Sequence, residues 1–86
     1  MTTVSISLCP TELEFNNGDR YNHQKLIEAI KNYIETKFND VYIITLQVGY
    51  KQGQKWAYIN NDKEQGSQLL SEFFGTYGTD DELFEN

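Results

Sequence analysis

The chain has 86 residues, of which 38% are hydrophobic, 14% aromatic and 23% charged, and its formal net charge at pH 7 is −6. This length fits one domain, and the composition is that of a folded chain rather than a low-complexity or disordered one. No apolar run reaches the roughly 20 residues of a membrane-spanning helix. The first fifteen residues lack a basic segment followed by an apolar one, so a secretion signal is not expected and we predict a cytoplasmic location.

The charge is unevenly distributed along the chain. Residues 1–40 carry a net charge of −2, residues 41–63 carry +2, and residues 64–86 carry −6 with no Lys or Arg. An acidic protein is repelled by nucleic acid and by anionic lipid, so we expect it to bind neither directly.

The first element is a strand over residues 3–8. Val4, Ile6 and Leu8 alternate with polar residues, which is typical of a half-buried strand, and Pro10 ends it. Residues 11–15 also alternate and are either a short second strand or a helical turn. The sequence "NNGD" that follows is a loop by its turn residues.

The period then changes to that of an amphipathic helix, with Asn22 as the predicted N-cap and Asn39-Asp40 at the end. The apolar positions follow the three-and-four spacing of a helix face that packs on a core. They are Leu26, Ile27, Ile30, Tyr33, Ile34 and Phe38.

Two β-rich runs flank Gln52-Gly53, and this pattern predicts a hairpin with a two-residue turn. In that register Gly49 pairs with Trp56 and Val48 pairs with Ala57. One face of the hairpin is then apolar, and the other carries Trp56, which covers the strand glycine, and Tyr58.

A second helix is predicted over roughly 64–74. Asp62 with Gln65 resembles a capping box, and Ser67 is a rival N-cap. Gly75 is the predicted left-handed C-cap. The buried stripe of this helix is Leu69, Leu70, Phe73 and Phe74.

The chain closes with the acidic sequence "GTYGTDDELFEN". Thr79 with Glu82 repeats the capping pattern and predicts one helical turn near the end. Leu83 and Phe84 are the residues expected to anchor this turn to the body, which a purely solubilising tail does not need.

These elements predict an α+β fold in the order β-(β)-α-β-β-α. We expect a small, mostly antiparallel sheet with two helices packed on one face. Residues 1–78 form the single domain, and residues 79–86 form an acidic C-terminal segment.

Few residues suit catalysis, and we predict that the protein is not an enzyme and carries no metal or cofactor. Cys9 and His23 are the only Cys and His, which is too few for a tetrahedral zinc site. We interpret Cys9 as a small apolar residue at a strand end rather than a nucleophile paired with His23. Paired carboxylates such as Asp80 and Asp81 lack the desolvating pocket that acid–base catalysis requires.

The sequence instead favours a protein-binding module, because aromatic residues are enriched at interfaces and carboxylates can imitate phosphates. The predicted partner is a protein with a basic surface, and the predicted function is inhibition or modulation. A concrete form is a phage- or plasmid-type nucleic-acid mimic that occupies the basic cleft of a host defence or DNA-processing protein. The predicted contact residues are Asp80, Asp81, Glu82, Glu85, Glu72, Trp56, Tyr58 and Tyr77.

Two alternatives stay open. The first is an immunity protein or antitoxin that neutralises a basic toxin enzyme, which uses the same chemistry. The second is a structural or assembly subunit that associates with itself through the face of Trp56 and Tyr58, so that both a monomer and a homodimer are compatible with the sequence. Lys51 and Lys55 near the hairpin tip are interpreted as charges that discourage pairing between sheet edges.

Overall fold

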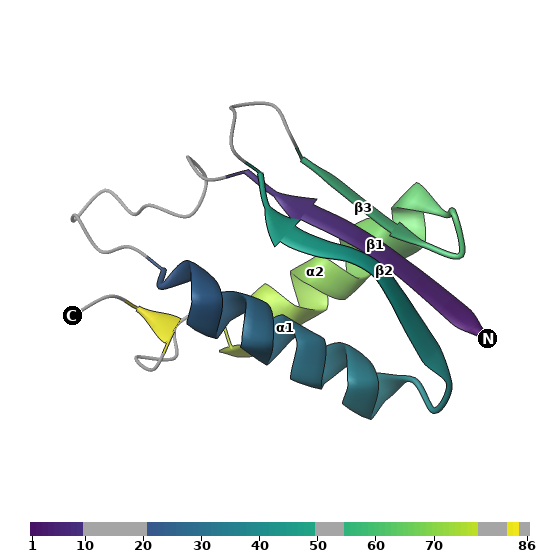
Figure 1. Ribbon diagram of the computed structural model, residues 1–86, viewed down its shortest axis with the longest axis horizontal. Coiled ribbons are helices and arrows are strands. Elements are labelled where there is room, and N and C mark those ends of the chain that lie inside the picture. Colours follow the sequence, from purple (N-terminus) through teal and green to yellow (C-terminus); the bar gives the residue numbers. More distant parts are fainter. Residues whose placement is uncertain (10–20, 50–54, 78–82, 85–86) are drawn as a thin grey trace.

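A computed structural model describes residues 1–9, 21–49, 55–77 and 83–84. Its elements are β1 (Thr2–Leu8), α1 (His23–Lys37), β2 (Val41–Val48), β3 (Trp56–Ile59) and α2 (Lys63–Tyr77) (Figure 1). The predicted α+β class is therefore confirmed, and the second strand or turn predicted at residues 11–15 lies outside the described residues.

The sheet has the strand order β2-β1-β3, with β1 parallel to β2 and antiparallel to β3. The sheet is thus mixed rather than mostly antiparallel. A parallel pair needs a long crossover, and α1 provides it between β1 and β2.

The predicted hairpin is wrong, because β1 lies between the two strands that were expected to pair. Val48 pairs with Leu8, and Ala57 pairs with Ile6. Trp56 pairs with Ser7 and therefore does not cover Gly49. Val4, Ile6 and Leu8 of β1 are all buried, and the central place of β1 in the sheet suits a strand whose core-facing side chains are apolar.

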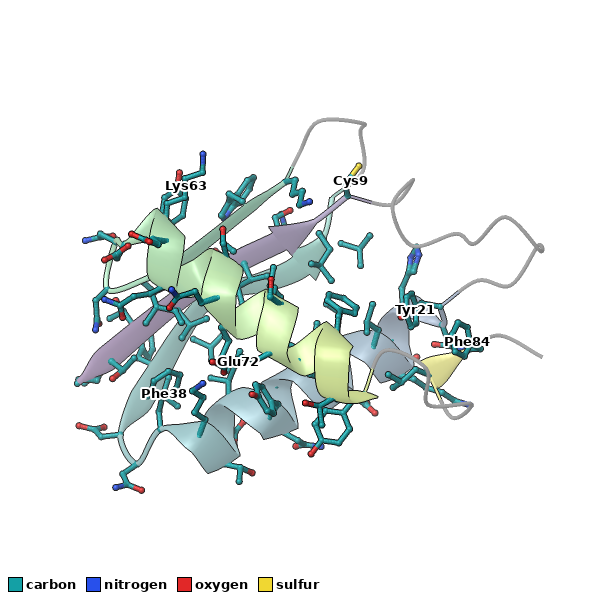
Figure 2. The ribbon with its side chains drawn as sticks, turned by 180° about the vertical axis from the view of Figure 1, so that it is seen from behind. Cys9, Tyr21, Phe38, Lys63, Glu72 and Phe84 are labelled. Atoms are coloured by element: carbon teal, nitrogen blue, oxygen red, sulfur yellow. The ribbon has the colours of Figure 1, made fainter. Side chains whose placement is uncertain are left out.

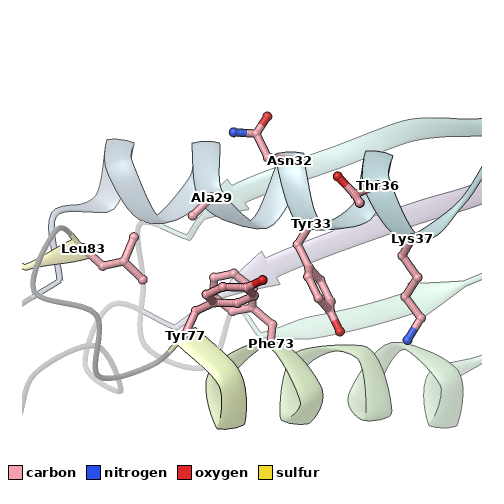
Figure 3. A pocket seen from close by; sticks show the side chains of 8 residues that line it. All are labelled: Ala29, Asn32, Tyr33, Thr36, Lys37, Phe73, Tyr77 and Leu83. Carbon is pink, nitrogen blue, oxygen red and sulfur yellow. The ribbon is translucent and has the colours of Figure 1, made fainter.

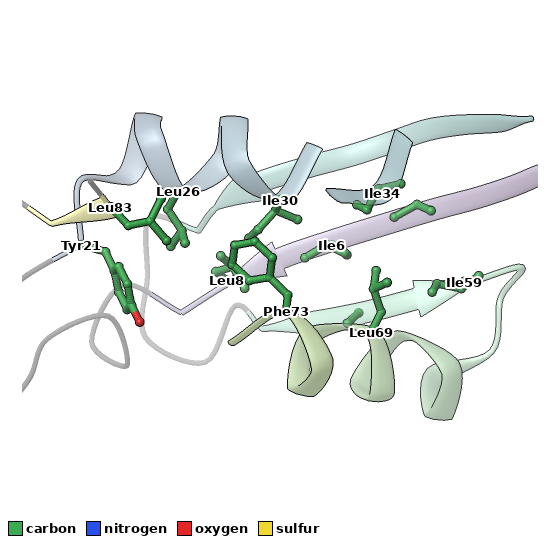
Figure 4. Packing of buried hydrophobic residues seen from close by; sticks show 12 residues of the cluster. Ile6, Leu8, Tyr21, Leu26, Ile30, Ile34, Ile59, Leu69, Phe73 and Leu83 are labelled. Carbon is green, nitrogen blue, oxygen red and sulfur yellow. The ribbon is translucent and has the colours of Figure 1, made fainter. Parts of the chain in front are cut away.

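Both helices pack on the same face of the sheet (Figure 4). Val4, Ile6 and Leu8 point into this core, as their alternation predicted. The helices contribute Leu26, Ile30 and Ile34 from α1 and Leu69 and Phe73 from α2 to this core, and β3 contributes Ala57 and Ile59.

The predicted N-caps of both helices are confirmed. The Asn22 side chain accepts a hydrogen bond from the backbone N–H of Lys25 at 3.1 Å. One Asp62 carboxylate oxygen accepts from the backbone N–H groups of Glu64 at 2.9 Å and Gln65 at 3.3 Å. Asp62, and not Ser67, therefore caps α2.

The end of α2 differs from the prediction. Gly75 is an exposed residue within the helix and not its cap, because α2 continues to Tyr77. The Tyr77 ring packs against Tyr33 and Phe73, with centroid distances of 5.9 and 5.6 Å. These contacts give the last turn apolar support that the sequence pattern did not reveal.

Candidate functional site

The C-terminal end is attached to the body at two residues. Leu83 is buried in the core, and its carbonyl oxygen accepts a hydrogen bond from the Asn22 N–H at 2.7 Å. The Phe84 ring stacks on Tyr21 with a centroid distance of 4.8 Å and an interplanar angle of 14° (Figure 2). Burial also raises the pKa of the Tyr21 phenol. The predicted anchoring by Leu83 and Phe84 is therefore confirmed.

The acids that flank this anchor in the sequence are Asp80, Asp81, Glu82 and Glu85. These four predicted contact residues lie outside the described residues, as does the start of the predicted turn. The described residues carry six acids and five lysines, a net charge of −1, so the other residues carry −5 of the total of −6. Most of the net negative charge thus belongs to residues outside the described ranges.

Glu72 joins the two helices. Its carboxylate accepts hydrogen bonds from the Lys37 ammonium and, at 3.3 Å, from the Tyr33 hydroxyl. The bond to Lys37 lowers the pKa of Glu72, and the same bond raises the pKa of Lys37. Lys37 offsets the Glu72 charge, so this predicted contact residue offers a partner less net charge than an unpaired acid does.

A groove of about 580 Å³ runs between α1 and α2 (Figure 3). The Tyr33 and Tyr77 rings meet edge to face in its wall, Leu83 lies toward one end, and Lys37 lies toward the other. Its remaining lining residues are Ala29, Asn32, Thr36 and Phe73. Sequence reasoning missed this groove, because it assigned Tyr33 and Phe73 to buried helix stripes and could not show where the two helices and Leu83 come together.

The two predicted strand aromatics lie on the sheet face opposite the helices. The Trp56 indole N–H donates a hydrogen bond to the Ser5 hydroxyl oxygen at 3.1 Å, and Trp56 is half-buried. Tyr58 is 37% exposed. Tyr77, the third predicted aromatic, lies in the helix layer, so the structure places these three residues on two different faces.

The described residues give no support to a metal site, since none of their His, Cys, Asp and Glu side chains form a group of three or more. Cys9 is buried next to the end of β1, as interpreted from the sequence, whereas His23 is exposed at the start of α1. Neither helix in the described part of the chain is long and apolar enough to cross a bilayer.

Comparison of the chain with protein-family models, with curated proteins and with solved structures finds no match. The functional argument therefore rests on the residues and geometry given above.

Proposed function

We propose that this protein is a non-catalytic binding module that docks its acidic C-terminal segment, residues 79–86, onto a basic surface of a partner protein. The observation that carries this proposal is the attachment of Leu83 in the core and of Phe84 on Tyr21. A tail that serves only solubility has no use for a buried leucine and a stacked phenylalanine. An attached segment presents its charges from a defined place on the body, which reduces the entropy lost on binding.

The chemistry of recognition is electrostatic. Carboxylates accept short charge-assisted hydrogen bonds from Arg and Lys, and Arg can bind them in a bidentate manner. Charge of one sign also steers a basic partner toward the docking surface, and salt weakens this attraction. Asp80, Asp81, Glu82 and Glu85 provide this charge in a segment that contains no base.

A basic protein surface that accepts several carboxylates is commonly one that otherwise holds phosphates. The proposed activity is therefore inhibition, in which the acidic segment occupies the nucleic-acid cleft of a cytoplasmic partner. A phage- or plasmid-type antagonist of a host defence or DNA-processing protein acts in this way. An immunity protein or antitoxin that neutralises a toxin nuclease uses the same contacts, and the identity of the captured partner separates the two.

The test substitutes acidic residues and does not truncate the chain, because a chain that ends at Gly78 would also lose the buried Leu83. The variant D80N/D81N/E82Q/E85Q removes four negative charges and keeps Leu83 and Phe84. A matched control, E28Q/E35Q/D40N/E64Q, removes four charges from exposed positions of the body. Both variants have a net charge of −2, so they differ only in where the charge was removed.

Each protein is immobilised and exposed to nuclease-treated lysate of the source cells at low and at high salt. We expect the wild type and the control to retain the same protein at low salt and to release it at high salt. The C-terminal variant should retain none of it. Equal retention by both variants contradicts docking through residues 79–86, and retention that salt does not weaken contradicts the electrostatic mechanism.

A further inference from the structure

The outer edge of β2 is the longest free strand edge in the described part of the chain. The strand order leaves β2 and β3 at the two edges of the sheet. An edge strand presents a row of unpaired backbone N–H and C=O groups that can pair with another strand, and proteins commonly protect it with charge, with a bulge or by keeping it short. β3 has four residues and lies between Lys55 and Lys63, whereas β2 has eight residues, "VYIITLQV", none of which is charged.

The side chains of β2 add an apolar surface to this edge. Tyr42 is 59% exposed and Ile44 is 58% exposed, while Ile43 between them packs against the core. The register of β1 with β2 shifts between Val4 and Ser5, which leaves Ile44 as the extra residue of a bulge. Tyr42 and Ile44 therefore both lie on the sheet face that the helices leave open.

We propose that two copies of this chain associate through their β2 edges, antiparallel about a two-fold axis, to form one continuous six-stranded sheet. A two-fold interface uses the same surface of both copies, so this surface must be complementary to itself. An antiparallel pairing centred near Ile43 meets this requirement, because it sets Tyr42 of each copy opposite the bulged segment that carries Ile44 of the other. Aromatic side chains and β-branched side chains are favourable cross-strand neighbours.

The charge distribution agrees with this choice of partner. Two copies with a net charge of −6 repel each other at long range, but their approach through β2 brings together strands that carry no charge. The helices cover the sheet face opposite Tyr42 and Ile44, so they do not obstruct this approach. The pairing also lengthens a three-stranded sheet to a number of strands that is common in stable domains.

The experiment is sedimentation velocity on the full chain over a wide range of concentrations, with the variants I44K and Y58K. Ile44 and Tyr58 are both exposed on the open face, but they belong to the two opposite edges of the sheet. We expect the wild type and Y58K to reach twice the chain mass of 10.0 kDa, and I44K to stay at the mass of one chain. Circular dichroism verifies that each variant is folded.

Amide hydrogen exchange provides a second readout that needs no variant. Backbone amides of β2 should exchange more slowly as the wild-type concentration rises, while those of β3 should not change. A wild type that remains a monomer throughout overturns the proposal. Loss of the dimer in both variants also overturns the proposal, and indicates instead that two copies stack through their open sheet faces. A dimer that forms in both variants overturns it as well.

Discussion

Gly66 of α2 lies directly against the backbone of Ala57 in β3. A Cβ atom on residue 66 would stand 2.1 Å from the Ala57 carbonyl oxygen and 2.3 Å from its carbonyl carbon. Both neighbours are backbone atoms of the sheet and cannot turn away as a flexible side chain can. Gly66 therefore allows α2 to pack closely on β3, even though glycine is a poor helix former.

The two glycines of α2 should respond to alanine in opposite directions. G66A should lower the free energy of unfolding by about 2 kcal/mol or more, because the helix must move away from the sheet. G75A should raise it by about 0.5–1 kcal/mol, since alanine favours the helix and nothing lies within 4 Å of the added atom. Urea unfolding followed by circular dichroism measures both. Stabilisation by G66A would contradict the close packing of α2 on β3.

Removal of the Phe84 ring should loosen the C-terminal anchor. F84A deletes the stack on Tyr21, and we expect a loss of stability of about 1–2 kcal/mol. The Asn22 amide, which donates to the Leu83 carbonyl, should exchange its hydrogen faster in this variant. Q68A is the control, because Gln68 is an exposed residue of α2, and its effect should stay within about 0.5 kcal/mol. If F84A leaves Asn22 exchange unchanged, Phe84 does not hold the segment in place.

Asn60 and Asn61 lie next to each other in the turn between β3 and α2, and they should respond differently to substitution. Both have left-handed backbone angles, with φ of 53° at Asn60 and 64° at Asn61. The Asn60 side chain also accepts a hydrogen bond from the Thr3 N–H at 2.9 Å. N61G should therefore be neutral or slightly stabilising, because glycine adopts this conformation without strain.

N60G keeps the backbone angle but loses the side-chain acceptor, and it should cost about 1 kcal/mol. Thermal unfolding of the two variants side by side measures the difference. Equal melting temperatures would mean that the bond to Thr3 contributes nothing to stability.

The Lys37–Glu72 ion pair should make stability depend on pH in the acidic range. The pKa of Glu72 is lower in the folded chain than in the unfolded chain. The pair therefore stabilises the fold above the ordinary carboxyl pKa, and this contribution disappears as the pH falls through the lowered value. Both side chains are largely exposed, so the effect should be small and should weaken in salt.

The variant E72Q isolates this effect. The wild type should be more stable than E72Q at neutral pH, and the difference should vanish at low pH, as measured by urea unfolding at each pH. K37M provides a second comparison with the wild type, since it removes the other partner of the same ion pair. A difference between the wild type and E72Q that persists unchanged in strong acid would exclude the ion pair as its cause.

The helices and their starting points could be predicted, because the signals for them are local. Asn22 and Asp62 each cap a helix whose apolar residues recur at helical spacing within a few residues. The attachment of Leu83 and Phe84 could also be predicted from the local sequence, since two large apolar residues within an acidic segment are expected to be buried.

The position of β1 between β2 and β3 could not be predicted, because it depends on competition among strands that are distant in the sequence. A Gln-Gly turn favours a hairpin locally, but β1 pairs with β2 along one edge and with β3 along the other, and so lies between them. Once β1 is central, Trp56 bonds to Ser5 rather than covering Gly49. The groove between the helices and the separation of Tyr77 from Tyr58 follow from the same three-dimensional arrangement.

The central claim is that the acidic end occupies a nucleic-acid surface of the partner, and displacement of a fluorescent oligonucleotide from the captured partner tests it most directly. We predict that the wild type and E28Q/E35Q/D40N/E64Q release the oligonucleotide at similar concentrations. D80N/D81N/E82Q/E85Q should require at least about a tenfold higher concentration, which corresponds to about 1.4 kcal/mol of binding free energy. Equal displacement by all three proteins, or binding of the partner without any displacement, would contradict the claim.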